Sequence, residues 1–188
     1  MIGDDEALVR AAQQGSLASF NQLVERYQTA LYNFVLRHVF DPQLAEDVTQ
    51  EAFLSAWRAV SSYKGGSFRA WLFRIAINEA RDLHRRAHRR PSTSLDTMVA
   101  EGTLGSHEAT GERGPEEQVV SSATMQSIEA ALQKLPGDQR MVILLSDVQQ
   151  MPYEEVAEAL GLPLGTVKSR LFRGRVALRR LLVESGEL

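Results

Sequence analysis

Residues Pro152–Arg180 read PYEEVAEALGLPLGTVKSRLFRGRVALRR and have the spacing of two helices joined by a sharp turn. Ala157 stands four residues before Gly161, and Val167 stands six residues after it. A small residue at Ala157 lets the helices approach closely, Gly161 permits the turn, and Val167 seats the second helix on the first. The pattern predicts a helix-turn-helix whose second helix begins at Pro163, because proline loses no needed donor there.

The second helix of this motif is expected to have a basic outer face. Its helical pattern turns these residues outward: Lys168, Ser169, Arg170 and Arg173. Such a helix can enter the major groove of DNA, with its early residues meeting base edges. A helical hairpin with a solvated, charged face is the alternative. The turn spacing and the absence of Asp and Glu between Pro163 and Arg180 favour DNA binding.

The net charge of −3 hides a segregation of charge along the chain. Basic residues gather in 64–90 and 163–180, whereas 1–57 and 91–125 are acidic. Two basic blocks separated by an acidic spacer indicate two contacts with a polyanion. Charge alone fits a set of solvated helix faces equally well.

Apolar periodicity predicts helices upstream of this motif. Stripes at three-and-four spacing run through 20–35, 45–60 and 68–83, with Asp41 and Pro42 as cap and first residue of the second helix. The segment 61–67 contains Gly65-Gly66 and is expected to be a loop. Residues 92–122 are acidic, rich in Ser, Thr and Gly, and lack periodicity, which is typical of a linker. We therefore expect an all-α chain with two small helical domains, 1–91 and 123–188, joined by a flexible acidic linker.

Several classes of function are disfavoured by what the sequence lacks. Cysteine is absent, which excludes disulfides and thiolate metal sites. No apolar run is long enough to span a bilayer and the N-terminus is acidic, so a soluble cytoplasmic protein is expected. His84 and His88 have a metal-capable spacing, but the neighbouring arginines would repel a cation, so no metal or cofactor is expected. No phosphate-cradling loop or nucleophile elbow supports an enzyme.

Several stretches together resemble the extracytoplasmic-function (ECF) sigma factors of the sigma-70 family. The C-terminal ones are Asp138-Gln139-Arg140, Tyr153-Glu154-Glu155-Val156-Ala157 and Gly165–Arg175. The upstream ones are Ala45–Phe53 and Trp71–Asn78. They occur in the family's order, with a linker of suitable length between the two groups. The resemblance implies a promoter-specific transcription initiation factor that acts through bacterial RNA polymerase, in a stress response, and has no catalytic residues of its own.

The resemblance assigns promoter "−10" recognition and melting to the loop and the helix that follows it. The residues implied are Tyr63, Lys64, Ser67, Phe68, Asn78, Arg81, Arg85 and Arg86. A glycine-bearing loop can shape a pocket for an unstacked base, Asn78 offers a donor and an acceptor, and the arginines can grip phosphates. Trp71 fits either a base-stacking role or the core, and Phe53 and Trp57 fit the core.

The resemblance assigns other surfaces to the "−35" element and to core polymerase. The −35 residues implied are Thr166, Lys168, Ser169, Arg170 and Arg173; those for the β′ clamp are Asp47, Gln50, Glu51 and Arg58. The β flap and an anti-sigma factor are further implied partners. The linker would thread along the polymerase, or serve as an ordinary spacer. A stand-alone repressor or activator is the rival hypothesis, and the two upstream stretches argue against it.

Overall fold

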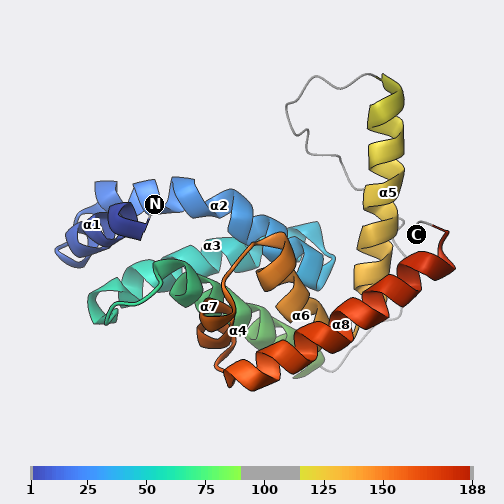
Figure 1. The fold of residues 1–188 in the computed structure, drawn as a ribbon. Coiled ribbons are helices and arrows are strands. Elements are labelled where there is room, and N and C mark those ends of the chain that lie inside the picture. The colour runs from blue at the N-terminus through green and yellow to red at the C-terminus, as the bar shows by residue number, and fades with distance from the viewer. Residues whose placement is uncertain (1, 90–114, 187–188) are drawn as a thin grey trace.

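The computed structural model describes residues 2–89 and 115–186, with side chains at 5–83, 85 and 125–186. Every regular element in those ranges is helical, which confirms the all-α prediction (Figure 1). The first unit contains α1 (Ile2–Gln13), α2 (Leu17–Val39), α3 (Pro42–Ala59), the short 3-10 helix η1 (Val60–Ser62) and α4 (Phe68–Arg89). The second contains α5 (Pro115–Lys134), α6 (Gly137–Ile143), the π-helical η2 (Leu144–Val148), α7 (Tyr153–Leu160) and α8 (Leu164–Glu184).

Local capping chemistry fixes the turn between α2 and α3. Phe40 ends α2 in the left-handed conformation, with φ of 57°. The Asp41 carboxylate then accepts a hydrogen bond from the Leu44 N–H at 3.0 Å, and Pro42 occupies the first turn. Both expected roles are confirmed, because a cap and an N-terminal proline satisfy donors that the helix start leaves open.

The boundary of the predicted linker needs correction. Helix α5 begins at Pro115, so residues 115–122, which were expected to belong to the linker, are helical. Pro115 with Glu116 and Glu117 is a favourable first turn, since proline fits the first position and acids favour the N-terminal end of the helix dipole. The remaining linker residues, 92–114, lie outside the described residues.

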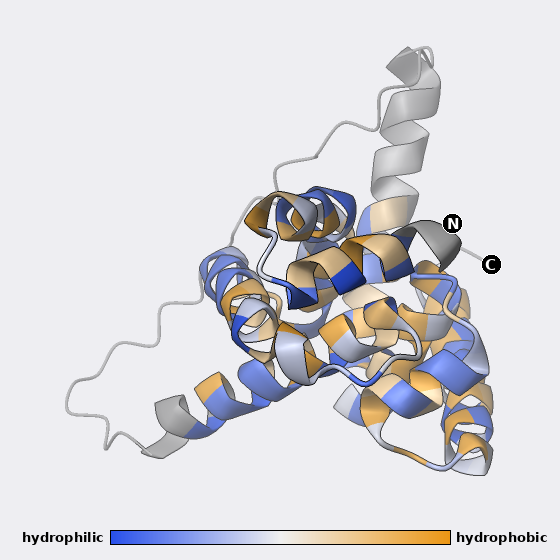
Figure 2. Cartoon of the chain, turned by 90° about the vertical axis from the view of Figure 1, so that its left-hand side faces the viewer, coloured by the Kyte–Doolittle hydropathy of each residue, from blue (hydrophilic) through white to orange (hydrophobic). Residues whose placement is uncertain are grey.

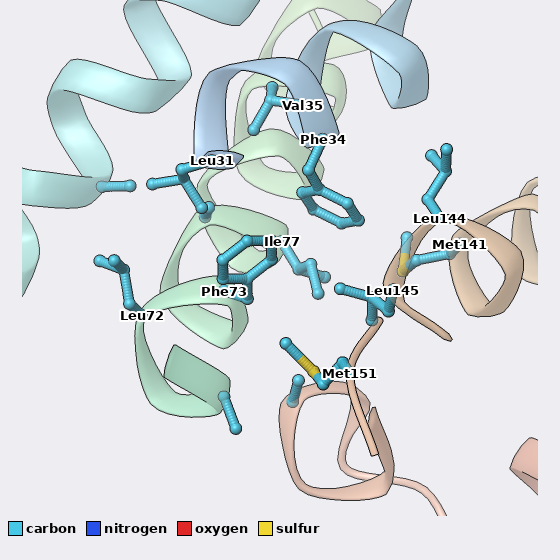
Figure 3. Packing of buried hydrophobic residues seen from close by; sticks show 14 of the residues in the cluster. Leu31, Phe34, Val35, Leu72, Phe73, Ile77, Met141, Leu144, Leu145 and Met151 are labelled. Carbon is cyan, nitrogen blue, oxygen red and sulfur yellow. The ribbon is translucent and has the colours of Figure 1, made fainter. Parts of the chain in front are cut away.

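The helices of both units bury one continuous apolar cluster. Phe34 of α2 and Phe73 of α4 lie with their ring centroids 5.2 Å apart. Figure 3 shows Leu145 and Met151 of the second unit lying beside these first-unit side chains. Orange, hydrophobic residues gather toward the interior in Figure 2, whereas the outer end of α4 is largely hydrophilic. The two units therefore share a core in this structure.

Gly174, in the middle of α8, packs directly against α6. A Cβ added at Gly174 would lie 2.9 Å from Ile143 Cδ1 and 3.4 Å from the Gln139 carbonyl oxygen. At Gly165, in the first turn of the same helix, an added Cβ would meet no atom within 4 Å. Packing therefore explains why a poor helix former occupies position 174.

Replacing Gly174 by alanine is expected to destabilise the chain by about 1–2 kcal/mol, because overpacking outweighs the gain of ~0.5–1 kcal/mol in helix propensity. The matched change Gly165→Ala should be neutral or stabilising by up to ~1 kcal/mol. Urea unfolding followed by circular dichroism measures both. Equal stabilisation by the two alanines would show that α6 moves away freely.

Candidate nucleic-acid interface

Helices α7 and α8 form the predicted helix-turn-helix. Gly161 ends α7 with φ of 64°, a left-handed conformation that glycine adopts without strain. The Leu162 N–H reaches back to the Ala157 carbonyl at 3.0 Å and closes the turn. Val156 and Val167 are fully buried and seat the two helices on each other. The turn at Gly161 and the seating of Val167 are confirmed, whereas Pro163 is the N-cap of α8 and the helix itself begins one residue later, at Leu164.

The exposed face of α8 combines basic and apolar groups. Lys168, Ser169 and Arg173 are exposed, as expected, and Thr166 is half-buried beside them. Phe172 lies among them with 70% of its surface exposed. A basic face with an exposed aromatic ring at its centre suits the major groove, where cations meet phosphates or guanines and apolar groups meet thymine methyls. Sequence reasoning missed Phe172; its place three and four residues from Ser169 and Lys168 is the signal that could have found it.

Arg170 departs from its expected outward orientation. It is half-buried, and its guanidinium lies 3.4 Å from the Asp138 carboxylate in the first turn of α6. The helical geometry explains this orientation. Position 170 directly precedes the buried Leu171, so its side chain turns toward the neighbouring helix. Arg170 thus lies at the edge of the exposed face and links α8 to α6.

Arg175 is held by an ion pair with two hydrogen bonds. Its Nε and Nη2 donate to the Asp147 carboxylate at 2.9 and 2.5 Å. These bonds raise the pKa of Arg175 above its ordinary value. A guanidinium bound bidentately to a carboxylate is partly neutralised, so Arg175 serves the attachment of α8 to η2 more than contact with a polyanion.

The loop 63–67 is shaped by its two glycines and by Tyr63. Gly65 and Gly66 have φ of 97° and 100°, and the Tyr63 hydroxyl donates to the Gly66 carbonyl at 2.8 Å. Burial raises the pKa of Tyr63 to about 12, helped by the negative charge of Glu158, so the hydroxyl stays protonated and can donate. Lys64 is exposed at the tip. The loop therefore presents backbone and one cation to solvent.

Two residues expected to contact DNA from this loop have structural roles. Phe68 is 4% exposed and packs against Tyr27, Tyr63 and Trp71, so it cannot stack on a base without unfolding the cluster. Ser67 caps α4, because its hydroxyl accepts from the Ala70 N–H at 3.2 Å. Trp71 is half-buried with its ring 5.1 Å from that of Tyr63, which favours the core role that the sequence left open.

The second half of α4 carries an open pocket of about 560 Å³. Asn78, Arg81, Asp82 and Arg85 line it. Asn78 and Arg81 are exposed, and Arg85 is paired with Asp82. The pocket offers an amide and two guanidiniums to a strand, as expected for this face. The side chain of Arg86 lies outside the described residues.

A second exposed surface lies on α3. Asp47 and Gln50 are exposed there, and the Glu51 carboxylate binds Arg58 at 3.0 Å. Leu54, 50% exposed, lies on the same face at the next turn. Sequence reasoning missed Leu54. Its position between Glu51 and Arg58, on the helix face expected to bind polymerase, is the signal that could have found it. An acid-leaning face with an apolar centre suits a basic protein surface better than DNA.

Metal-binding clusters and membrane-spanning helices are both absent from the described part of the chain. In residues 5–83, 85 and 125–186, no group of three His, Asp or Glu side chains could hold a metal ion. His84 and His88 lie outside the described side chains. Over the described helices, none has the length and apolar character needed to cross a membrane.

Comparisons with known proteins find a separate match for each of the two helical units. The family model for sigma-70 region 2 matches residues 23–90, and the model for sigma-70 region 4 matches 125–178. The RNA polymerase sigma-H factor of Pseudomonas aeruginosa is 36% identical over 180 residues, covering 95% of this chain and 93% of that protein. The ECF RNA polymerase sigma-E factor of Escherichia coli is 38% identical over 176 residues, covering 93% and 92%.

Two solved structures resemble both units together. CnrH in complex with the cytosolic domain of CnrY has a TM-score of 0.70 at 28% identity, covering 96% of this chain and 98% of that one. RpoE from Bartonella quintana in complex with the anti-sigma factor NepR has a TM-score of 0.65 at 27% identity, covering 88% and 98%.

Proposed function

The chain belongs to the sigma-70 family of RNA polymerase sigma factors, in its ECF branch, and we propose from this that it binds core RNA polymerase and directs initiation at specific promoters. The observation that carries the proposal is the ordered match of both sigma regions to the two helical units. In this function the chain acts as a binding protein. The polymerase catalyses RNA synthesis, and this chain recognises the promoter. Its working place is then the cytoplasm, where the polymerase is.

We assign −35 recognition to the second unit, which contains α5 to α8, through α8. Lys168, Ser169 and Arg173, with Thr166 beside them, carry the polar contacts, and Phe172 adds an apolar one. Arg170 keeps α8 attached to α6 and adds positive charge at the edge of the face. The recognition helix then enters the major groove from its N-terminal end.

We assign −10 recognition and strand opening to the first domain, 1–91. Loop 63–67 would receive the unpaired base, with Lys64 close to the strand. Asn78, Arg81 and Arg85 line the α4 pocket and would hold the exposed strand, and Arg86 extends the same basic run in sequence. Trapping a freed base offsets part of the cost of opening the duplex.

We assign polymerase binding chiefly to the α3 face. Asp47, Gln50, Glu51, Leu54 and Arg58 would dock on the β′ clamp, while the second domain would contact the β flap. Because CnrH and RpoE resemble this chain in their complexes with CnrY and the anti-sigma factor NepR, we also propose control by an anti-sigma factor, released in a stress response.

Reconstituted transcription tests the function. Purified chain and bacterial core polymerase are incubated with a genomic fragment library, and the 5′ ends of the RNA are sequenced. Discrete starts that share two upstream motifs and vanish without this chain are the expected result. Operator binding by the chain alone, with no specific starts, would instead favour the repressor or activator.

Asn78→Ala is expected to reduce open-complex formation about 10-fold while leaving polymerase affinity unchanged. The amide can both donate to and accept from a base edge, and its loss corresponds to about 1–1.5 kcal/mol of transition-state stabilisation. Permanganate footprinting on the mapped promoter measures opening, and anisotropy measures polymerase binding. Asn21→Ala, an exposed amide on α2, is the control. Loss of polymerase binding would place Asn78 in the other interface.

A further inference from the structure

Gln13, the last residue of α1, reaches the segment that leads into loop 63–67. Its side-chain amide nitrogen donates to the Tyr63 carbonyl oxygen at 2.8 Å and to the Val60 carbonyl oxygen at 3.2 Å. Both partners are acceptors, so the NH2 group must face them, and it has one N–H for each. Both amide hydrogens are therefore used on the entry to the loop.

These bonds act at the point where the backbone leaves η1. Tyr63 follows this short helix and is extended, with φ of −65° and ψ of 125°. Its N–H still donates to the Val60 carbonyl at 3.1 Å, whereas the extended ψ turns its own carbonyl out of the helical direction. Gln13 supplies a donor to that carbonyl, as buried or half-buried backbone groups require. The exit from η1 is thus fixed by a residue 50 positions away in the sequence.

Tyr63 carries this anchoring across the loop. Its hydroxyl donates to the Gly66 carbonyl at 2.8 Å. Gly65 and Gly66 both have positive φ and no side chain to restrict them, so contacts from outside must keep the loop in one shape. Ser67 ends the loop as the cap of α4. With Gln13 at one end and Ser67 at the other, the two glycines form a short span between fixed points.

Helix α1 is itself fixed on the first unit, so it can serve as a support. Val9 and Ala12 of its inner face belong to the buried apolar cluster. Near its other end, the Asp5 carboxylate accepts hydrogen bonds from the Tyr27 hydroxyl and the Arg26 guanidinium of α2. Burial and the bond to Asp5 raise the pKa of Tyr27 above its ordinary value, so its hydroxyl remains a donor. Figure 1 shows α1 and the turn from α3 to α4 at the same end of the first unit.

We propose that Gln13 is a positioning residue for base capture: through its amide, α1 holds loop 63–67 in the shape that receives the unpaired promoter base. The inference rests on the proposed function, because it takes this loop as the base-receiving element. A loop that is ordered before binding loses less conformational freedom when the base arrives, which strengthens capture. Gln13 thus contributes to selectivity for one base without itself meeting the DNA.

The first test uses holoenzyme, made from core polymerase and the full-length chain, on the promoter mapped by reconstituted transcription. An abasic nucleotide is placed at each −10 position in turn, and the position where the unchanged chain loses most identifies the captured base. The readout, called the capture ratio, is the rate of open-complex formation on the intact promoter divided by the rate on that abasic promoter. Permanganate footprinting measures both rates.

Gln13→Ala should lower the capture ratio about 5- to 10-fold, because two hydrogen bonds that order the loop are lost. Gln13→Glu keeps the length of the side chain but brings an acceptor-only group against two carbonyl oxygens, so it should lower the ratio at least as much. Gln14→Ala removes an exposed amide from the same end of α1 and is the matched control. It should leave the ratio within about 2-fold of its original value.

The capture ratio distinguishes positioning from a general structural effect. A variant that folds less well, or binds polymerase less well, slows opening on both promoters equally and leaves the ratio unchanged. An unchanged ratio for Gln13→Ala would therefore overturn the proposal at any overall rate of opening.

The second test asks whether Gln13 acts through Tyr63. Tyr63→Phe removes the hydroxyl that binds the Gly66 carbonyl and keeps the ring in its contacts with Phe68 and Trp71. Because both residues order the same loop, the double variant should lose little more of the capture ratio than the more damaging single variant. A loss equal to the product of the two single losses would contradict the chain of contacts from α1 to Gly66.

The third test needs no DNA and separates this inference from the function it rests on. In the free, full-length chain, Gln13→Ala should raise amide hydrogen exchange in residues 61–67 about 5-fold, while Gln14→Ala should not. Equal exchange in the two variants would overturn the anchoring itself. Specific starts together with an unchanged capture ratio would reject the positioning role and leave the sigma-factor function standing. An absence of specific starts with the unchanged chain would reject the function itself.

Discussion

Replacing Phe73 by alanine is expected to destabilise the chain by about 3–5 kcal/mol, the usual loss for a large aromatic side chain deleted from a core. Phe73 is fully buried at the junction of the two units. Its ring packs on Phe34 and lies 5.7 Å from the Arg69 guanidinium, which binds Gln149. The cavity would therefore weaken the first domain and the contact between Arg69 and Gln149 together.

Thermal unfolding checks this expectation. A loss of 3–5 kcal/mol in a chain of this size should lower Tm by about 10 °C. Phe73→Leu keeps most of the volume and should cost less than about 1.5 kcal/mol, so it separates cavity formation from the loss of any apolar group. A cost for Phe73→Ala below 1 kcal/mol would mean that Phe73 is not buried in this core in solution.

The parts of the fold that were predictable are those set by local chemistry. Asp41 caps α3 through its own side chain, Pro42 fits the first turn, and Gly161 permits the turn between α7 and α8. Each effect acts within a few residues and is therefore visible in the sequence. The start of α5 at Pro115 carried the same kind of signal, but the polar composition around it resembled a linker.

The differences between expected and observed side-chain orientation at the candidate sites have a different origin. Phe68 follows a glycine loop, a position compatible with a base-stacking ring, yet three aromatic neighbours bury it. Arg170 lies only one residue from exposed Ser169, and that step of 100° turns it toward Asp138. Both outcomes depend on which helix lies alongside, and spacing within one helix does not contain that information.

The contact between the units was also beyond sequence reasoning. Leu145 and Met151 have the pattern of core residues whichever helix covers them. Gln149 and Glu158 resemble ordinary solvated residues until α2, α4 and loop 63–67 are placed next to them. Long-range packing decides such roles, so the contact between the two units emerges only from the structure.

Replacing Phe172 by glutamate is expected to weaken binding to the −35 duplex about 100-fold, or about 3 kcal/mol. The ring is 70% exposed in the middle of the basic α8 face, so its removal costs little folding energy. Loss of an apolar base contact accounts for about 1–2 kcal/mol, and a carboxylate facing phosphates adds about 1 kcal/mol or more. Anisotropy with a duplex carrying the mapped −35 element measures the effect.

Val183→Glu is the matched control for this charge. Val183 is 52% exposed on the same face of α8, eleven residues further along. That is about 16 Å of helix, beyond the Debye length of about 8 Å at physiological salt. A local role for Phe172 therefore predicts less than about a 3-fold loss from Val183→Glu, whereas a role for net charge alone predicts similar losses from both. Equal losses would remove Phe172 from the recognition surface and leave −35 binding to the basic residues beside it.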